Sequence, residues 1–490
     1  MKLTKTDFIQ YLNCPKSLWL LKHKPDVYQQ YESGFSSFLK KLIREGYEVE
    51  RYVKELFPQA KNIGTVDTKE IKKILSQETG MFLQTVFQTD SGVFARVDVL
   101  EIHEDKTVSL YEVKSATSIK TDTKHNHLKD VAFQQYVLAQ NGYVIKHLYL
   151  INLNKDFVKT GSIDPQELLK VVQVDALVAK IFNKTVSEIE SALALVKQTE
   201  IDETCCSCLD KTRANHCDTF KYFNPNLPQD SIYSLRKISV SKIKKLRGLG
   251  IKKISEVPLD FELSSYQILQ RESVNQGRPI INREQIRETL ASLKFPLYFF
   301  DYETLPFAVP KIDGYKPHQP LPVQYSLHIL SEEGQVQHFE YLAETLEPPQ
   351  KLVAELKKQI KPIGTLISWN KSYEGRINTE TAELYPEYLN FLQDLNERTF
   401  DLMDIFKADY VDAKFDGKNS IKFVQPVLVP QLSYKKLEIQ NGTMAIEATE
   451  KMFTATNSKT TTEVRRALLK YCELDTLAMV EIYKKLIMLK

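Results

Sequence analysis

Two carboxylates at the end of an apolar strand constrain this chain more than any other feature. The apolar run 295–300 leads directly to Asp301 and Glu303, and residues two apart in a strand point to the same face. Tyr471 and Asp475 stand four residues apart, so a helix would present both on one face, one turn apart. Two carboxylates on a strand and a third on a helix, beside a tyrosine, predict a divalent-metal site of the type used in phosphodiester cleavage.

The length of the chain predicts more than one domain. Its 490 residues exceed one typical domain, and we expect domains at 1–225 and 291–490, joined by a basic helical linker at 226–290. The net charge of only +3 means that any nucleic-acid binding would come from local patches. The sequence has neither an apolar run of roughly 20 residues nor a signal-peptide core, which predicts a cytoplasmic protein without a membrane partner.

Hydrophobic periodicity outlines the elements of both domains. It predicts helices in 1–60, 126–140 and 164–198, with strands in 81–114 and 146–153. In the last 200 residues it predicts four strands, at 296–303, 323–331, 336–342 and 365–369, and helices at 349–360 and from 462 onward. We therefore expect an α/β fold in the first domain and an α+β fold around a mixed sheet in the last.

A second set of carboxylates lies in the first domain. Asp98 lies on one predicted strand, and Glu112 and Lys114 share one face of the next. Two carboxylates can hold Mg²⁺ or Mn²⁺ through oxygen atoms, and a lysine can orient the attacking water or offset charge on the phosphate. An exposed cross-strand ion pair is the alternative interpretation of an isolated Glu-x-Lys.

The spacing of Asp98, Glu112 and Lys114 resembles the D…ExK core of the PD-(D/E)XK nucleases. In their RecB-like branch a helix with a Q-x-x-x-Y motif follows, and Gln134 matches its glutamine. The resemblance implies a restriction-endonuclease-like fold in which Asp98 and Glu112 bind the metal. It also implies that Lys114 and Gln134 belong to the catalytic set.

Two positions depart from the RecB-like pattern. Leu138 stands where the motif has its tyrosine, and Tyr136 comes two residues early. The branch often carries a histidine in a G-x-x-x-H pattern, and Glu50 occupies that position. A glutamate can still ligate a metal ion.

The cysteines extend the resemblance. Cys14 near the start, then Cys205, Cys208 and Cys217 after the nuclease core, are similar to the CRISPR-associated RecB-like exonucleases and the AddB C-terminal nuclease. That resemblance implies a 4Fe-4S iron–sulfur cluster on these four thiolates. A tetrahedral Zn²⁺ is the alternative, as are plain buried cysteines, and Cys206 could substitute for Cys205.

The last domain resembles the DEDD exonucleases of the RNase H-like superfamily. Their first motif, D-x-E, matches Asp301 and Glu303. Their second motif, N-x-x-F/Y-D, corresponds to segment 370–374, where Glu374 replaces the aspartate. Their third motif in the tyrosine subclass, Y-x-x-x-D, matches Tyr471 and Asp475.

This second resemblance implies an RNase H-like fold and a 3′–5′ exonuclease. Two metal ions would be held by the four carboxylates, and Tyr471 would orient the attacking water. Cys472, inside the third motif, is expected to be a packing residue of the last helix. A scaffold that has lost activity is the alternative interpretation.

The linker is strongly basic. Segment 237–253 contains seven Lys or Arg and no acidic residue. Its centre resembles the hairpin of helix-hairpin-helix modules, in which glycines let backbone N–H groups approach phosphates; a solvated basic helix face is the alternative. The residues expected to bind nucleic acid are Lys244, Lys245, Arg247, Gly248 and Gly250.

Together these patterns predict a metal-dependent nuclease, an exonuclease with two catalytic domains, acting on DNA, with RNA as a further candidate substrate. A different class of protein remains open at this level. The departures at Glu50, Leu138 and Glu374 are compatible with a nucleic-acid-binding or scaffold protein whose sites are degenerate.

Overall fold

The computed structural model of the chain describes residues 2–31, 37–64, 68–122 and 125–489. The chain divides into two compact units. Unit 1 comprises Met1–Leu227 and Phe307–Gln319, and unit 2 comprises Pro228–Pro306 and Pro320–Lys490. No helix in the described ranges combines the length and the apolarity that a bilayer span requires.

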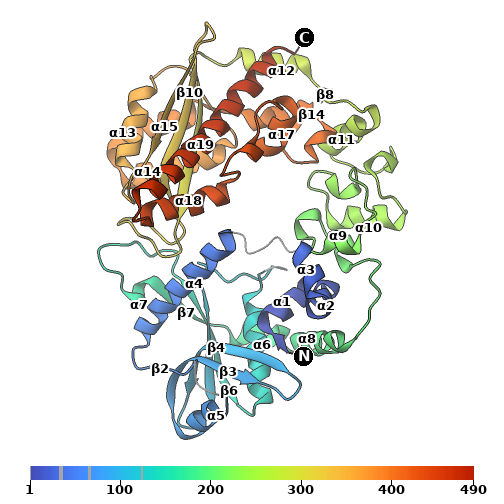
Figure 1. Cartoon of the computed structure of the whole chain (residues 1–490), viewed down its shortest axis with the longest axis vertical. Helices are drawn as coiled ribbons and strands as arrows, with labels where there is room; N and C mark the ends of the chain where they lie inside the picture. Colours follow the sequence, from blue (N-terminus) through green and yellow to red (C-terminus); the bar gives the residue numbers. More distant parts are fainter. Residues whose placement is uncertain (1, 32–36, 65–67, 123–124, 490) are drawn as a thin grey trace. The chain divides into compact units, whose positions relative to one another are not determined.

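Unit 1 is built on a seven-stranded mixed sheet with the order β2-β3-β4-β5-β6-β7, and β1 pairs with β4 (Figure 1). The strands are β1 (Leu3–Thr4), β2 (Lys61–Asn62), β3 (Gly80–Gln88), β4 (Val93–Ile102), β5 (Val108–Lys114), β6 (Ile145–Leu153) and β7 (Leu169–Gln173). The antiparallel meander β3-β4-β5 confirms the alternation seen in 81–114. Strand β6 then runs parallel to β5.

Helices cover both faces of this sheet. They are α1 (Lys5–Asn13), α2 (Pro15–His23), α3 (Pro25–Tyr31), α4 (Ser37–Leu56), α5 (Thr68–Gln77), α6 (His127–Gln140), α7 (Pro165–Leu168), α8 (Asp175–Lys197) and α9 (Phe220–Phe223). Phe133 of α6 and Val178 of α8 pack on the face that carries Leu100. Val53 of α4 packs with Val99 on the opposite face, as the alternation of β4 requires.

One expected element of unit 1 is wrong. The stretch 164–198 was predicted to be continuously helical, but it contains the short helix α7 and strand β7 before α8 begins. Strand β7 pairs antiparallel with β6, with Val171 opposite Ile151 and Val172 opposite Leu150. Two adjacent β-branched residues favour the sheet edge over the helix once a partner strand is present.

Unit 2 contains a five-stranded sheet with the order β11-β10-β9-β12-β13. Its strands are β9 (Leu297–Pro306), β10 (Pro320–Leu330), β11 (Val336–Leu342), β12 (Thr365–Ser368) and β13 (Thr399–Asp401). The first three strands in chain order pair antiparallel, and β12 and β13 continue the sheet parallel to β9. A separate pair joins β8 (Ile280–Ile281) to β14 (Tyr410–Val411).

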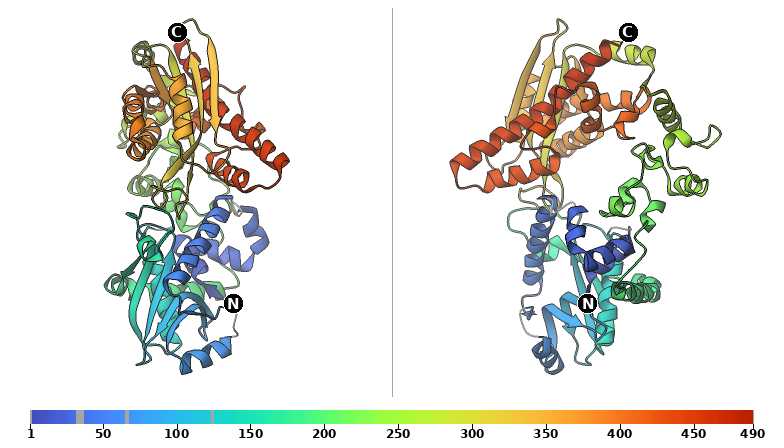
Figure 2. Two further views of the ribbon diagram at one scale, coloured as in Figure 1. Left: turned by 90° about the vertical axis from the view of Figure 1, so that its left-hand side faces the viewer. Right: turned by 45° about the vertical axis from the view of Figure 1, so that its right-hand side comes forward.

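Helices also cover both faces of the unit 2 sheet, and α19 runs along one face (Figure 2). They are α10 (Val240–Gly248), α11 (Ser265–Gln276), α12 (Arg283–Ala291), α13 (Gln350–Gln359), α14 (Lys371–Leu384), α15 (Leu389–Glu397), α16 (Ile405–Ala408), α17 (Ile421–Leu428), α18 (Gly442–Thr454) and α19 (Ser458–Ile487). Phe299 of β9 packs with Met479 of α19. Its neighbour Phe300 packs on the other face, with Leu356 of α13.

Buried polar contacts fix α19 along the sheet. The Gln324 side chain on β10 donates a hydrogen bond of 3.1 Å to the carbonyl of Leu468. The Thr476 hydroxyl lies 2.7 Å from the Ser326 hydroxyl and 2.8 Å from Nδ1 of His328. Because buried polar groups are costly when unpaired, these bonds fix the register of α19 and hence the height of residues 471–475 over the sheet.

Segment 226–290, expected to be a linker, belongs almost entirely to unit 2. The Tyr266 hydroxyl of α11 donates to Oδ1 of Asn419 at 3.1 Å, and the Ser234 hydroxyl donates to Oδ1 of Asp416 at 2.6 Å. Gly417 lies so close that a Cβ there would meet the carbonyl oxygen of Ser234 at 2.0 Å. The basic segment is therefore packed on the second unit.

Candidate functional site

The two carboxylates of β9 face α19. Asp301 and Glu303 lie on the same strand face as Phe299, whereas Tyr302 between them is buried in the opposite core. The Tyr302 hydroxyl donates to Oδ1 of Asn378 on α14 at 3.1 Å. The alternation predicted from the sequence therefore places both carboxylates on one side of the sheet.

Helix α14 adds the third carboxylate in its first turn. Glu374 is 4% exposed, and its charge contributes to the raised pKa of Asp301, after burial and the charge of Asp475. The helix begins after Asn370, whose φ of +81° reverses the chain leaving β12. The backbone N–H of Asn370 donates to Oδ1 of the buried Asp401 at 2.9 Å, so Asp401 positions the helix that carries Glu374.

Helix α19 supplies Tyr471 and Asp475, which are both buried. The Tyr434 hydroxyl donates to Oδ1 of Asp475 at 2.5 Å. The Lys422 ammonium donates to the Tyr471 hydroxyl at 2.7 Å. No sequence pattern pointed to Tyr434, because it begins a separate short 3-10 helix, Tyr434–Lys436, 41 residues from the aspartate that it holds.

The structure thus brings together the predicted carboxylates of unit 2. Burial, then the charges of Asp475 and Glu374, raises the pKa of Asp301 well above its ordinary value. Burial raises the pKa of Glu303 and of Glu374 to about 8, and that of Asp475 to about 6. Like charges gathered in a buried site disfavour ionisation, and a bound cation would relieve that cost.

Two observations describe the ligand atoms that this site offers to a cation. Ligand atoms of Asp301, Glu303 and Cys472 lie within 4.8 Å of one another, and Oε2 of Glu374 is buried without a hydrogen-bond partner. Carboxylate oxygens are the ligands that Mg²⁺ and Mn²⁺ prefer. Cys472, expected only to pack, is buried and also faces the carboxylates; burial and then the charge of Asp301 raise the pKa of its thiol.

A cavity of about 670 Å³ opens onto this site. Asp301, Glu303, Tyr471 and Asp475 line it, together with Lys422. Arg236 and Lys237, from the segment before α10, line the same cavity, as do Trp369, Asn370 and Tyr373. The cavity therefore has an acidic part and a basic part, both within unit 2.

Unit 1 brings its predicted residues together where the end of β5 passes the middle of β4. Oδ2 of Asp98 accepts the backbone N–H of Val113 at 2.9 Å. Glu112 is 1% exposed, and the ammonium of Lys114 lies 2.7 Å from its Oε1. Nε2 of Gln134 on α6 donates to the other oxygen of Glu112.

Sequence reasoning missed two members of this group. Lys5 of α1 pairs with Oε1 of Glu112 across 107 residues, and Asp130 of α6 pairs with Lys114. Oδ1 of Asp130 and Oε1 of Gln134 are buried without hydrogen-bond partners. Such oxygens fit a cation ligand set.

The electrostatics of the unit 1 site differ from those of unit 2. Burial, then the charge of Glu112, raises the pKa of Asp98 to about 7. Burial opposes ionisation of Glu112, but Lys114 and Lys5 outweigh it and hold the Glu112 pKa below its usual range. Although burial acts the other way, Glu112 and Asp130 raise the pKa of Lys114, which therefore stays charged.

The residues that depart from the RecB-like pattern lie in different surroundings. Leu138 and Tyr136 are buried in the apolar core beside α6, so neither reaches the carboxylates as a ligand. Glu50 on α4 accepts a hydrogen bond from Gln84 at 3.4 Å. Burial raises its pKa, and the nearby charge of Glu112 adds to that shift, so Glu50 does face the unit 1 site.

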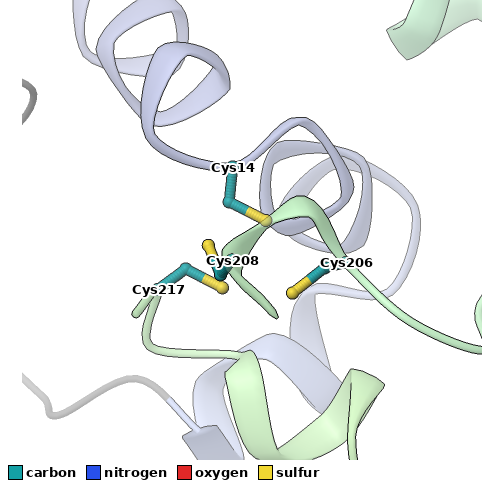
Figure 3. A group of neighbouring side chains, drawn as sticks. All are labelled: Cys14, Cys206, Cys208 and Cys217. Atoms are coloured by element: carbon teal, nitrogen blue, oxygen red, sulfur yellow. The ribbon is translucent and has the colours of Figure 1, made fainter. Parts of the chain in front are cut away.

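Four buried cysteines form a further candidate site in unit 1 (Figure 3). Their Sγ atoms all lie within 4.8 Å of one another. Cys14 separates α1 from α2, and the other three lie in the segment that follows α8. The group consists of Cys14, Cys206, Cys208 and Cys217.

This set corrects the predicted ligands at one position. Cys206 belongs to the group, while Cys205 is exposed and lies outside it. Successive residues point in opposite directions in the extended backbone at Cys206, which has φ −124° and ψ 161°. Nδ2 of Asn224 lies 3.6 Å from the Cys206 sulfur, an orienting contact expected around a metal thiolate.

The four sulfurs are close enough together that they could hold a metal ion or an iron–sulfur cluster. A single tetrahedral zinc, with Zn–S bonds of about 2.3 Å, needs sulfurs about 3.8 Å apart. The observed spacing, within 4.8 Å, accepts such an ion directly. A 4Fe-4S cluster places each thiolate on a separate iron and therefore needs the sulfurs to spread apart.

The basic residues expected to bind nucleic acid lie on and after α10. Lys244, Lys245 and Arg247 are exposed. A Cβ at Gly248 or at Gly250 would meet nothing within 4 Å, and Gly250 has a φ of +75°. The turn after α10 therefore needs glycine at 250 for its backbone conformation.

The comparisons with known proteins bear on part of the chain. Residues 298–420 match the model of a domain of unknown function (DUF2779), a segment that carries Asp301, Glu303 and Glu374 but ends before Tyr471. The chain is 27% identical over 230 residues to the uncharacterized protein MG366 homolog of Mycoplasma pneumoniae, covering 42% of this chain and 34% of that relative. It is 25% identical over 232 residues to uncharacterized protein MG366 of Mycoplasma genitalium, covering 43% and 35% respectively. The alignments thus span about a third of the length of these curated relatives, and the family model that the chain resembles over residues 298–420 is DUF2779.

Proposed function

We propose that the chain is a metal-dependent nuclease that cleaves phosphodiester bonds at the end of a nucleic-acid strand. The observation that carries the proposal is the convergence of four carboxylates from three elements of unit 2. They are Asp301 and Glu303 of β9, Glu374 of α14 and Asp475 of α19. None of the four forms an ion pair with a described lysine, arginine or histidine, so the charge of the group calls for a cation.

The sheet of unit 2 supports an RNase H-like fold. Three antiparallel strands precede two that run parallel to β9, in the order β11-β10-β9-β12-β13. Asp301 and Glu303 lie on the central strand β9, the second motif lies at the start of α14 between β12 and β13, and the third motif lies on α19. An RNase H-like fold would carry the D-x-E and Y-x-x-x-D motifs on such elements, which supports the proposal.

The roles of the side chains follow from their partners. When bound, divalent ions on the four carboxylates would stabilise the attacking and leaving oxygens of the phosphate. Tyr434 orients Asp475 through its hydrogen bond. Burial, then the charge of Asp475, raises the pKa of Tyr471, so its hydroxyl stays protonated and positions a water or phosphate oxygen. Lys422 offsets negative charge on the phosphate.

Unit 1 is proposed as a second, RecB-like metal site. Asp98 and Glu112 would hold the ion, with the unpaired oxygens of Gln134 and Asp130 beside them. Lys114 is charged rather than neutral, so it offsets phosphate charge and does not act as a base. The substrate class that we propose is DNA for unit 1 and either DNA or RNA for unit 2.

The four cysteines are proposed to hold a metal centre that joins the start of unit 1 to its end. The distance of Cys14 from the others in the sequence favours an iron–sulfur cluster, while the close sulfur spacing is what a single zinc needs. Anaerobic purification followed by iron, sulfide and zinc analysis decides between them. Absorbance near 400 nm with bound iron supports the cluster, and a colourless protein with one zinc refutes it.

A specific observation favours a second candidate function for unit 1. Glu112 already has two ammonium partners, Lys5 and Lys114, whereas the four clustered carboxylates of unit 2 form no ion pair with any described residue. A site neutralised by its own lysines can bind nucleic acid without cutting it. Unit 1 would then be a binding module for a catalytic unit 2.

The test is degradation of end-labelled single-stranded DNA and RNA in Mn²⁺, with and without a chelator. We expect Mn²⁺-dependent shortening from one end, lost in Asp301→Ala. Unchanged cleavage in Asp98→Ala would establish unit 1 as a binding module, and loss in that variant would establish it as a second active site. If wild-type protein cleaves no DNA or RNA end, the nuclease proposal fails.

A further inference from the structure

The basic part of the unit 2 cavity is not explained by the carboxylate site. Arg236 and Lys237 line the same cavity as Asp301 and Glu303, although they precede β9 by some sixty residues and lie outside the segment that matches a family model. Neither residue was expected from the sequence to bind nucleic acid. Their position therefore needs a separate explanation.

Buried side chains hold the backbone on either side of Arg236. Gln270, 1% exposed, accepts the backbone N–H of Arg236 at 3.0 Å and donates to the carbonyl of Ser234 at 2.7 Å. Gln267, also buried, donates to the carbonyl of Arg236 at 2.8 Å. Two buried glutamines of α11 thus fix a short segment whose side chains line the cavity.

Lys237 has a costly backbone conformation. Its φ is +50°, in the left-handed region that glycine adopts readily and other residues avoid. A residue other than glycine is strained in this conformation. Keeping a lysine there indicates that its charge at this position matters.

The charges of these two residues are not used for an ion pair. The Arg236 guanidinium lies 4.7 Å from the ring centroid of Tyr266, which fixes its plane and leaves its N–H groups available. No described carboxylate lies within ion-pair distance of Arg236 or Lys237. A guanidinium fork and an ammonium side by side are suited to phosphate oxygens.

A second hollow continues from this point. It has a volume of about 270 Å³, and Arg236 and Lys237 line it too, together with Ser239 and Lys242 at the start of α10. Because the two hollows share Arg236 and Lys237, they adjoin. A cavity of about 670 Å³ is of small-molecule size, so an unpaired strand end fits it and a duplex does not.

We infer that Arg236, Lys237 and Lys242 form a phosphate track that holds a single-stranded polynucleotide where it leaves the carboxylate site. This inference rests on the proposed function, since the strand end must lie at Asp301 and its neighbours. The track contacts the phosphates beyond the one that is cut. It makes the substrate class a polynucleotide rather than a mononucleotide ester.

The test compares two substrates in the full-length protein. One is a labelled single-stranded oligonucleotide, and the other is the p-nitrophenyl ester of thymidine 5′-monophosphate, which has no further phosphate. The variants are Arg236→Gln and Lys237→Gly; the second removes the charge at a position where glycine relieves the backbone. Lys351→Ala, an exposed lysine of α13 outside the cavity, is the charge-matched control.

For each track variant we expect kcat/KM on the oligonucleotide to fall about tenfold more than kcat/KM on the ester, as the loss of one charge-assisted contact implies. The slope of the logarithm of the oligonucleotide binding constant against the logarithm of salt concentration should become shallower by about 0.7 for each phosphate contact that is lost. Lys351→Ala should alter neither value. Equal losses on both substrates, or no loss on the oligonucleotide, would overturn the track.

Binding separates this inference from the proposed function. If the wild-type protein cleaves neither substrate, the nuclease proposal fails, and fluorescence polarisation with the labelled strand still tests the track. Weaker binding by Arg236→Gln and Lys237→Gly, with Lys351→Ala like wild type, supports it. Equal binding by all four proteins refutes it.

Discussion

The ammonium of Lys422 donates a hydrogen bond of 2.7 Å to the hydroxyl of Tyr471. The pair joins α17 to α19 across 49 residues. The same ammonium acts on Glu303 and Asp475, opposing the rise of their pKa values. Among the described residues, Lys422 is therefore the cation whose charge acts on both Glu303 and Asp475.

Lys422→Met should reduce the cleavage rate of unit 2. Removing a charge that stabilises the transition state typically costs about 100-fold in kcat, and substrate binding should change less. Single-turnover cleavage of a labelled strand in saturating Mn²⁺ measures this. Tyr471→Phe, which removes only the hydroxyl, should cost less than Lys422→Met; single-turnover rates within about twofold of wild type for both would contradict their assigned roles.

The metal-free protein should lose stability as pH rises from 6 to 8.5. The pKa values of Glu303 and Glu374 are about 8 in the folded chain, above the ordinary value of about 4.3. The folded state therefore binds more protons than the unfolded state, and this stabilisation is lost as pH rises through the folded pKa. Thermal unfolding in a chelator across this range measures it; a rising Tm would contradict it.

Asp301→Asn should raise the Tm of the metal-free protein at pH 8 while abolishing the stabilisation by Mn²⁺. Neutralising one of four clustered carboxyls removes repulsion and also removes a ligand. Glu332→Gln, at an exposed position of the turn between β10 and β11, is the control and should leave both values unchanged. A variant that Mn²⁺ still stabilises fully would show that Asp301 is not a ligand.

Lys5→Met should destabilise unit 1 and increase its response to metal. The substitution removes one of two ammonium partners of the buried Glu112, at a cost of about 1–2 kcal/mol. Mn²⁺ should then restore more stability to the variant than to wild type, because the cation takes over the lost charge. Urea unfolding with and without Mn²⁺ tests this, and equal Mn²⁺ effects would count against a metal site at Glu112.

Cys206→Ser and Cys205→Ser form a matched pair at neighbouring positions. Cys206 belongs to the buried four-sulfur group, and Cys205 is exposed outside it. We expect Cys206→Ser to lose bound metal and to unfold at a lower temperature, while Cys205→Ser keeps both values. Metal analysis and thermal unfolding decide this, and the opposite pattern would return Cys205 to the ligand set.

Gly417→Ala and Gly248→Ala should have opposite effects on stability. A Cβ at Gly417 would meet the carbonyl of Ser234 at 2.0 Å, and the φ there is +68°, so the variant should lose about 2 kcal/mol or more. Gly248 is the last residue of α10 and would meet nothing within 4 Å, so alanine should be neutral or favourable by up to about 1 kcal/mol. Equal effects in chemical unfolding would contradict the close packing of segment 234–236.

Local patterns in the sequence predicted the elements that carry the carboxylates. The strand period of two placed Asp301 and Glu303 on one face of β9, and the i, i+4 spacing placed Tyr471 and Asp475 on one face of α19. The meander β3-β4-β5 followed from alternation in the same way. Each of these features depends on residues a few positions apart, so the sequence alone contains the information.

Features that depend on distant partners escaped the sequence. Strand β7 forms because β6 offers it a partner, although the surrounding periodicity favours a helix. Segment Phe307–Gln319 lies between two strands of unit 2 yet belongs to unit 1, where the backbone N–H of Ala308 donates to Glu45 at 3.1 Å. Such choices depend on which buried surfaces the folded chain brings together.

The sequence by itself determined which residue types face one another: paired carboxylates on a strand, a tyrosine and an aspartate on a helix, and cysteines at both ends of one unit. Tertiary structure alone decided that Cys206 replaces Cys205, that Lys5 pairs with Glu112, and that Arg236 and Lys237 line the cavity of the unit 2 carboxylates. The physical reason is range. Backbone geometry repeats every two or 3.6 residues and can be seen in a single segment, whereas contacts across more than a hundred residues exist only once burial has selected one packing of the whole unit.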